Sequence, residues 1–301
     1  MTNTRGDGRS VEIDLDPVYV VARRVLLDAL IALAPHGKAT IVVGAQAVYL
    51  RTGQGDLAIA PYTTDADLAL DPMLLGDEPA LEASMRGAGF ELMDQNPQPG
   101  RWVASVLVGG QQVTIPVDLI VPEANAAPGG RRGARLGVHG NRAAHRAVGL
   151  EAALVDHSTM NVAALDPRDH RTVEVEVAGV AALLVAKAHK IHDRVASKRA
   201  DRLSDKDAAD VYRIMQTASA GQVGSTFGEL GRHPKAGEPT LVAMTYLADL
   251  FGRRHGRGIE MAQRALRAAI PAAQVTALCV SFTERLLDAA GLDEQGPVRR
   301  P

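Results

Sequence analysis

Asp65 and Asp67 are the residues in this sequence whose types and spacing best suit chemistry. They lie two positions apart in a predicted strand, so their side chains would project to one face while Ala66 and Leu68 bury the other. Two carboxylates with Cα atoms ~7 Å apart repel each other unless a cation lies between them, a spacing that suits one or two Mg²⁺ ions. The alternative is an exposed strand end with two solvated acids.

Asp118 adds a third acid. It is the only charged residue in the apolar segment 112–121, where an isolated carboxylate is costly unless it is paired or binds metal. Pro116 suggests a bulge or a sheet edge that would aim this side chain. If this strand lies beside the strand of Asp65 and Asp67, about 4.8 Å away, the three carboxylates converge on one face. Otherwise Asp118 ends its strand at the surface.

A glycine turn offers the complementary half of a phosphate site. The β-branched run 40–43 ends at Gly44, and helical composition follows from Ala45 to Arg51. A helix that starts directly after a glycine presents free backbone N–H groups and the positive end of its dipole, which bind phosphate without a side chain. Ala45 has no hydroxyl, so only its N–H would contribute. Taken alone, such a glycine commonly just joins a strand to a helix.

The elements that must position these residues alternate in the first half of the chain and are helical in the second. Gly109 and Gly110 between two apolar runs predict a two-residue hairpin. The predicted strands cover 40–43, 65–70, 102–108, 112–121, 152–156 and 172–177, and the predicted helices 45–51, 79–87, 179–198, 204–217, 238–252, 258–269 and 271–290. We therefore predict an α+β protein, with a mixed-sheet domain over 1–177 and a helical domain over 178–301.

Composition restricts the class of protein further. The 301 residues are 46% hydrophobic and carry 33 Lys and Arg against 35 Asp and Glu, which argues against a uniformly basic surface for nucleic acid. The single cysteine, Cys279, lies in an apolar helix and fits a reducing compartment. No apolar run approaches the ~18 residues that span a bilayer, so we expect a cytoplasmic protein without a membrane partner.

The loop 123–142 is the exception to the balanced charge. It is rich in Ala, Pro, Gly and Arg and is predicted to be exposed and mobile. From Ala124 to Leu150 the chain has no acid, and Arg131, Arg132 and Arg135 are closely spaced. A polyanion such as RNA would be bound here. The alternative is a loop whose arginines only keep it soluble.

These motifs together resemble the polymerase-β-like nucleotidyltransferases, and more particularly the AbiEii/AbiGii group, the toxins of type IV toxin–antitoxin systems that include the MenT enzymes. That group has a glycine turn, a Thr-x-Asp-x-Asp strand and a later lone Asp. A helical half follows, with a Lys and an Arg two turns apart and then a basic-Asp-x-x-Asp segment. The resemblance covers about 41–215, where the helical motifs are Lys187, Arg194, Lys206, Asp207 and Asp210.

The resemblance implies a fold, an activity and partners. It implies a polymerase-β-like sheet domain that moves a nucleoside monophosphate from an NTP to an acceptor, the 3′ end of tRNA, so that translation and growth stop. It also implies a cognate antitoxin protein. The implied metal ligands, for two Mg²⁺, are Asp65, Asp67 and Asp118; the further catalytic residues are Lys187 and Asp210; the nucleotide-binding residues are Gly44, Ala45, Thr64, Lys187, Arg194 and Asp207.

The helical motifs also have structural interpretations. From Lys187 to Lys206 there are seven Lys or Arg and three Asp, which would attract a triphosphate but is also typical of a solvated helix face. Asp207 stands three residues after Ser204, the spacing of a capping box, so the alternative is that it serves the helix N-terminus rather than chemistry. Asp210 has no capping role, and we therefore rank it above Asp207.

Two other functions compete with an RNA-modifying toxin. A small-molecule nucleotidyltransferase of the antibiotic-modifying kind shares the three acids, but its cationic acceptor needs an acidic pocket, whereas the loop here is arginine-rich. A non-catalytic nucleotide-binding or antitoxin-docking module is the second. Failure to bind Mg²⁺ and nucleotide would favour it, and the intact set of Asp65, Asp67 and Asp118 speaks against it.

Overall fold

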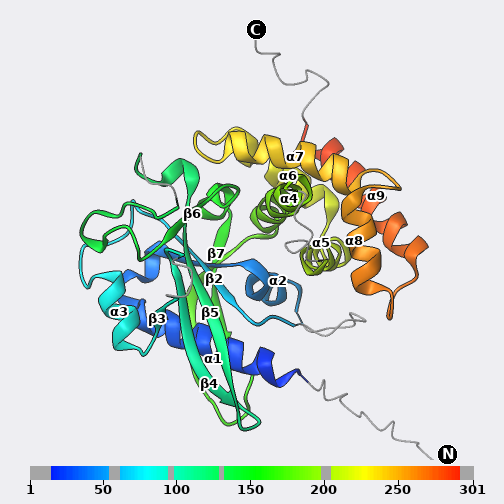
Figure 1. Cartoon of the computed structure of the whole chain (residues 1–301). Coiled ribbons are helices and arrows are strands. Elements are labelled where there is room, and N and C mark those ends of the chain that lie inside the picture. Colours follow the sequence, from blue (N-terminus) through cyan, green and yellow to red (C-terminus); the bar gives the residue numbers. More distant parts are fainter. Residues whose placement is uncertain (1–14, 54–61, 94–97, 129–131, 198–204, 292–301) are drawn as a thin grey trace, which may run out of the picture.

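The strands of the computed structural model form one mixed sheet (Figure 1). The structure describes residues 15–53, 62–93, 98–128, 132–197 and 205–291. Within these ranges the strand order is β3-β4-β5-β2-β1-β8-β7, and β6 pairs with β5. The strands are β1 (Thr40–Val43), β2 (Ala66–Leu70), β3 (Glu91–Leu92), β4 (Arg101–Val108), β5 (Gln111–Pro122), β6 (His145–Ala147), β7 (His157–Ala163) and β8 (Thr172–Ala178). The predicted α+β class with a mixed sheet is confirmed.

Strand directions at the centre of the sheet decide where the acids lie. β1 is antiparallel to β2, whereas β2 is parallel to β5. β4 and β5 form the predicted hairpin, and both Gly109 and Gly110 have positive φ, which a two-residue turn of this kind requires. Pro116 pairs with Val103 of β4, and the β2 pairing begins only at Val117, so Pro116 lies where β5 has a single described partner strand. A proline, which cannot donate a backbone hydrogen bond, is tolerated at such a position.

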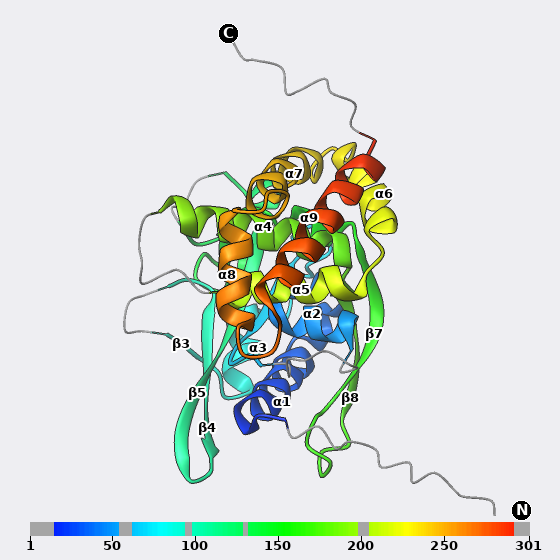
Figure 2. The same ribbon diagram turned by 90° about the vertical axis from the view of Figure 1, so that its right-hand side faces the viewer.

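The helices α1 and α2 have different neighbours. α1 crosses the sheet and packs against β2, β4, β5 and β8. α2 packs between the strands β1 and β2 and the helices α4 and α5. Figure 2 shows the β4–β5 and β7–β8 hairpins extending on either side of α1. The helices are α1 (Pro17–Ala32), α2 (Gly44–Thr52), α3 (Leu81–Gly87), α4 (Val180–Ala196), α5 (Lys206–Thr217), α6 (Ala220–Gly231), α7 (Gly237–Phe251), α8 (Arg257–Leu266) and α9 (Ala272–Ala289).

The core of the sheet half contains the single tryptophan. Trp102 at the start of β4 is fully buried, and its Nε1 donates a hydrogen bond to the Ala143 carbonyl at 3.0 Å. Tyr19 of α1 is buried as well. Because Ala143 belongs to the segment after the arginine-rich loop, this bond fixes that segment to the sheet.

The helical half packs closely through small residues. A Cβ on Gly224 of α6 would lie 2.4 Å from the Leu286 carbonyl oxygen of α9, so only glycine permits this approach. Cys279 of α9 is buried in the same half, and burial raises the pKa of its thiol to about 12, as expected for a packing residue.

Several sequence-based predictions of elements were wrong. The segment 152–156 is not a strand, because residues Glu151–Leu154 form a 3₁₀ turn. α1, α6 and β7 were not predicted. The loop 123–142 is not wholly exposed, since Ala134 and His139 are buried within it.

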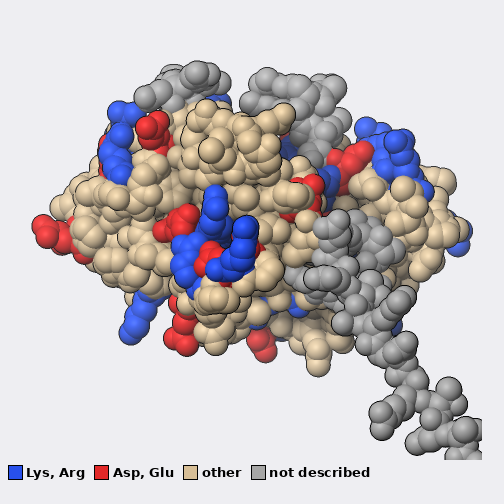
Figure 3. All heavy atoms as spheres, turned by 90° about the horizontal axis from the view of Figure 1, so that it is seen from below, with Lys and Arg blue, Asp and Glu red and all other residues tan. Residues whose placement is uncertain are grey.

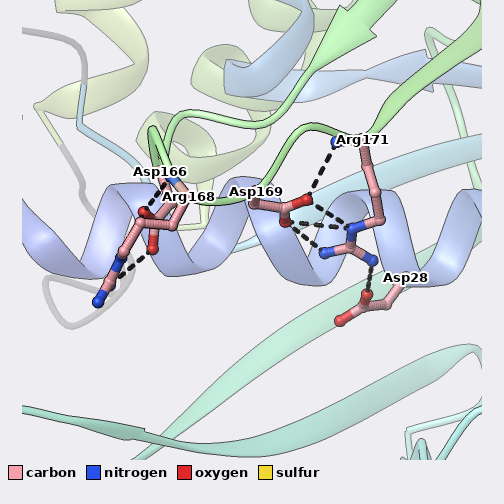
Figure 4. Close-up of polar contacts among 5 residues, drawn as sticks. All are labelled: Asp28, Asp166, Arg168, Asp169 and Arg171. Carbon is pink, nitrogen blue, oxygen red and sulfur yellow. Dashed lines mark hydrogen bonds and ion pairs between the residues drawn. The ribbon is translucent and has the colours of Figure 1, made fainter.

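The turn between β7 and β8 is held by ion pairs (Figure 4). Arg171 Nη1 donates to Asp28 Oδ1 of α1 at 2.6 Å and Arg171 Nη2 to Asp169 Oδ2 at 2.6 Å. Arg168 binds Asp166 in the same turn, and these bonds lower the pKa of Asp166 to about 2. Seen from below, lysine and arginine side chains are interspersed with acidic ones (Figure 3), so this face has no patch of one sign among the residues that the structure describes.

Across the described residues, no helix combines the length and the apolar character that crossing a membrane requires.

Candidate active site

Asp67 and Asp118 lie directly opposite each other on neighbouring strands. In the parallel register of β2 and β5, Asp67 is the partner of Asp118, and on its other side Asp67 is opposite Val43 of β1. Asp65 precedes the first residue of β2. The sequence left open whether the two acidic strands are neighbours; the structure pairs them and places two carboxylates at one level of the sheet.

Gly44 is pressed against the Asp67 carboxylate. It has φ +69°, and a Cβ built on it would lie 2.0 Å from Asp67 Oδ2. α2 starts here, and no side chain caps its N-terminus in the described part of the chain. The N–H groups of the first turn therefore remain available to a ligand. Ala45 is buried, and its backbone N–H as a phosphate ligand stays a prediction.

The acids do not ionise equally in the absence of a cation. Burial, reinforced by repulsion from Asp65 and Asp118, raises the pKa of Asp67 to about 6. Burial also raises the pKa of Asp118, although Arg101 opposes this effect. Burial favours protonation of Asp65 as well, but the Thr63 hydroxyl and nearby lysines outweigh it and hold the pKa of Asp65 below its ordinary value.

The donor set fits a hard divalent cation. Asp118 Oδ1 is buried without a hydrogen-bond partner among the described residues, and Arg101 Nε, at 3.9 Å, is too far away to provide one. A cation between Asp67 and Asp118 would relieve their repulsion and satisfy this oxygen. In the described ranges, no three His, Cys, Asp or Glu side chains are gathered closely enough to hold one ion together. Binding of Mg²⁺ by all three aspartates stays a prediction.

A pocket of about 470 Å³ opens in front of these two acids. The sheet half contributes Gly44, Asp67 and Asp118, and α4 contributes Lys187 and Lys190. The remaining wall is largely apolar. Its other lining residues are Val43, Ile120, His145, Arg146, Ala147, Val148, Leu150, Leu183, Ala186 and Asp193. Acidic, cationic and apolar groups thus meet in one cavity, which is typical of a site for a charged ligand with an apolar part.

Lys187 is the centre of a buried ion cluster. Its Nζ lies 2.6 Å from both Asp207 Oδ1 and Asp210 Oδ2, and its side chain is 5% exposed. Arg194 also donates to Asp207, and the Tyr49 hydroxyl donates to Asp210 at 3.2 Å. The structure therefore brings together four of the residues that the helical motifs predicted.

The capping role predicted for Asp207 involves a residue that the structure does not describe. Asp207 lies in the first turn of α5, where an acid is favourable to the helix dipole. Ser204, its partner in the predicted capping box, lies outside the described residues. The Asp207 carboxylate bonds to Lys187 and Arg194, so it joins α5 to α4.

Thr63 links the two halves of the molecule at Asp65. The buried Thr63 hydroxyl donates to Asp65 Oδ1 at 2.5 Å and accepts from Lys206 Nζ at 2.9 Å. Thr64, a predicted nucleotide ligand, lies between Thr63 and Asp65 in the chain and is half-buried. Neither Thr64 nor Asp65 is among the described residues that line the pocket.

The arginine-rich loop runs beside the pocket. Arg132 and Arg135 are exposed, whereas Arg131 lies outside the described residues. The Arg132 carbonyl accepts from the backbone N–H of Arg146, a residue that lines the pocket. Arg146 itself is paired with Glu123, its Nη2 lying 2.6 Å from Oε1. The segment that carries the predicted RNA-binding arginines is thus bonded to the wall of the pocket.

Sequence reasoning placed Lys190 only among the basic residues between Lys187 and Lys206, on the helix face of Lys187. It assigned no site role to Arg101 or His145. Arg101 lies opposite Asp118 in the β4–β5 register, and His145 reaches the pocket only through the β5–β6 pairing. No local pattern predicts either contact. Burial lowers the pKa of His145.

No family model, curated protein or solved structure matches the chain, so its function has to be inferred from the geometry of this site and the motifs that form it.

Proposed function

We propose that the protein is a Mg²⁺-dependent nucleotidyltransferase of the polymerase-β-like type, which transfers a nucleoside monophosphate from an NTP to an acceptor hydroxyl. The observation that carries the proposal is the packing of Asp67 between the Gly44 turn and Asp118. Gly44, Asp67 and Asp118 line one pocket, so a cation held by the two acids would share this cavity with the N-terminus of α2. A metal-bound triphosphate requires both.

Asp67 and Asp118, with Asp65, would hold Mg²⁺, which when bound neutralises the triphosphate and acidifies the acceptor hydroxyl. The acceptor oxygen forms a bond to the α-phosphorus, and the bond from that phosphorus to the α,β-bridging oxygen breaks. Pyrophosphate leaves with that oxygen, and the hydroxyl proton passes to the Asp118 carboxylate. The backbone N–H groups of Gly44 and Ala45 would donate hydrogen bonds to phosphate oxygens. The backbone would not have to rearrange during the reaction to do so.

The acceptor in this proposal is the 3′ end of tRNA. Arg132 and Arg135 are exposed beside the pocket and supply cations for an RNA backbone. The resemblance to type IV toxins extends the proposal to a cytoplasmic toxin that blocks translation and growth and is controlled by a cognate antitoxin.

The test is incubation of the purified protein with Mg²⁺, total RNA and each α-labelled NTP in turn. We expect label to enter an RNA of tRNA size with one or few NTPs, and Asp67→Asn and Asp118→Asn to abolish it. Label in a small cationic acceptor instead of RNA would favour the small-molecule enzyme. No transfer together with no binding of NTP would sink the proposal and favour a non-catalytic module.

A further inference from the structure

Lys187 is already fully engaged by acids. Its ammonium contacts two buried carboxylates at 2.6 Å each. A phosphate that took this ammonium would deprive Asp210 of the cation bonded to it at 2.6 Å, and the neutral Tyr49 hydroxyl and the charge of the neighbouring Arg213 would have to compensate. Leaving a buried charge undercompensated is strongly unfavourable. Lys187 is therefore poorly suited to bind and release a triphosphate in each turnover.

Lys190 has the properties that Lys187 lacks. Both lysines line the pocket of Gly44 and Asp67, but Lys190, three residues further along α4, has a side chain that is 42% exposed, against 5% for Lys187. Its ion pair with Asp207 is long, at 3.4 Å. Asp207 also bonds to Lys187 and Arg194, so Lys190 can leave it without stranding the carboxylate.

The charges around the pocket favour the same assignment. Lys190 lines the same pocket as Asp67 and Asp118, so its half-exposed ammonium borders the cavity that these two acids also line. A triphosphate chelated by a cation at these acids would extend toward the N–H groups of α2. A flexible, half-exposed ammonium at this edge is a suitable phosphate ligand.

We propose that Lys190 is the side chain that contacts the triphosphate, and that Lys187 is a positioning residue whose ion pairs fix α4 against α5 so that Lys190 faces the Gly44 turn. This inference rests on the proposed function. Lys190 neutralises non-bridging oxygens of the β- and γ-phosphates and stays with them as pyrophosphate leaves. Lys187 remains bonded to Asp207 and Asp210 throughout.

The experiment measures binding of inorganic tripolyphosphate and of each NTP in Mg²⁺ by calorimetry. The variants are Lys190→Gln, which removes the charge, and Lys190→Arg, which keeps it. The matched control is Lys38→Gln, because Lys38 is an exposed lysine just before β1, at the strand end away from Gly44. We expect Lys190→Gln to weaken both ligands about tenfold or more with an unchanged melting temperature. Lys190→Arg should retain most of the affinity, and Lys38→Gln all of it.

Each remaining outcome has a distinct meaning. Suppose that the unaltered protein transfers nucleotide, and that the Lys190→Gln variant binds tripolyphosphate as tightly as the unaltered protein does. This inference then fails and the proposed function stands. If Lys187→Met keeps its melting temperature but loses tripolyphosphate binding, the roles of the two lysines are reversed and the inference again fails. If the unaltered protein binds neither tripolyphosphate nor any NTP, the proposed function fails and the inference with it.

Discussion

Asp67 is a carboxylate whose ionisation the folded protein opposes. It is opposite Asp118 on one side, touches the Gly44 turn on the other, and has its pKa raised to about 6, first by burial and then by its acidic neighbours. The folded protein therefore binds this proton more tightly than the unfolded chain, where an aspartate has a pKa of about 3.9. Such a group stabilises the fold at low pH and loses that contribution as the pH rises from about 4 to about 6.

This difference gives a prediction for unfolding in the absence of divalent cations. The stability of Asp67→Asn relative to the unaltered protein should increase between pH 4 and pH 7, by at most about 3 kcal/mol, because the variant has no carboxylate to ionise. Urea unfolding in a chelator at four pH values measures it. Asp77→Asn, which removes an exposed carboxylate, is the matched control. If the free energy of unfolding depends on pH equally in the two variants, burial of Asp67 is not the cause of a raised pKa at this position.

At the scale of elements, the junction of β1 and α2 fixes the site. Gly44→Ala would place a methyl group 2.0 Å from Asp67 Oδ2 and demand a positive φ from alanine. We expect loss of transfer and a destabilisation of more than about 1 kcal/mol, since the backbone conformation alone costs that much. Gly109→Ala is the control, because it also has positive φ but nothing within 4 Å of its Cβ. Gly109→Ala should lose stability and keep nucleotide transfer. Loss of transfer in both variants would contradict the explanation that a methyl group at position 44 displaces the Asp67 carboxylate.

The α4–α5 contact carries a second prediction. Lys187→Met leaves Asp207 and Asp210 buried with less compensation, so we expect a loss of about 3 to 5 kcal/mol in the free energy of unfolding. Lys190→Met, in which a half-exposed ammonium is removed, should change stability by less than about 1 kcal/mol. Chemical denaturation of both variants at pH 7 measures the difference. Similar losses would show that Lys187 is not the anchor of this contact.

A helix or strand could be predicted from the sequence where neighbouring residues determine it, and not where contacts with distant residues do. β1, β4 and β5 carry β-branched runs bounded by glycine, and the sequence pattern was sufficient for them. α6 was missed because its glycines are typical of a loop, whereas Gly224 is there to admit α9. The segment 152–156 has strand-like residues, but Glu151 accepts hydrogen bonds from the backbone of Gly149 and Ala124 and a 3₁₀ turn results.

The same distinction holds for the candidate site. Asp65, Asp67 and Asp118 stand out because charge is rare in apolar strands, and strand pairing then brings Asp67 beside Asp118. Lys187 and Asp210 were predicted as site residues, but their mutual bond joins residues 23 positions apart and no spacing rule predicts it. Arg101 and His145 enter the site through β4 and β6, which only the completed sheet positions.

At the scale of the whole molecule, the pocket joins both halves of the chain, and the exposed arginines lie on one side of it. Arg132→Ala with Arg135→Ala should weaken RNA binding and lower the slope of log K against log salt by about 0.7 for each lost phosphate contact, since counterions are no longer released there. Tripolyphosphate binding should not change. Filter binding at several salt concentrations measures the slope.

The control for this prediction removes two exposed arginines elsewhere. Arg168 lies in the β7–β8 turn and Arg285 in α9, and both are exposed. Arg168→Ala with Arg285→Ala lowers the net charge equally. If it reduces the salt slope as much as the loop variant does, RNA is attracted by overall charge and the loop is not its binding site.

The only tryptophan is buried, so its intrinsic fluorescence reports on the interior of the protein. Trp102 follows Arg101 and is opposite Val117, the neighbour of Asp118, so its indole ring lies on the face of the sheet opposite to the Asp118 carboxylate. Its emission responds to nearby charge and to exposure to water. The emission therefore reports the unfolding of the sheet half without any label, separately from that of the helices, which contain no tryptophan.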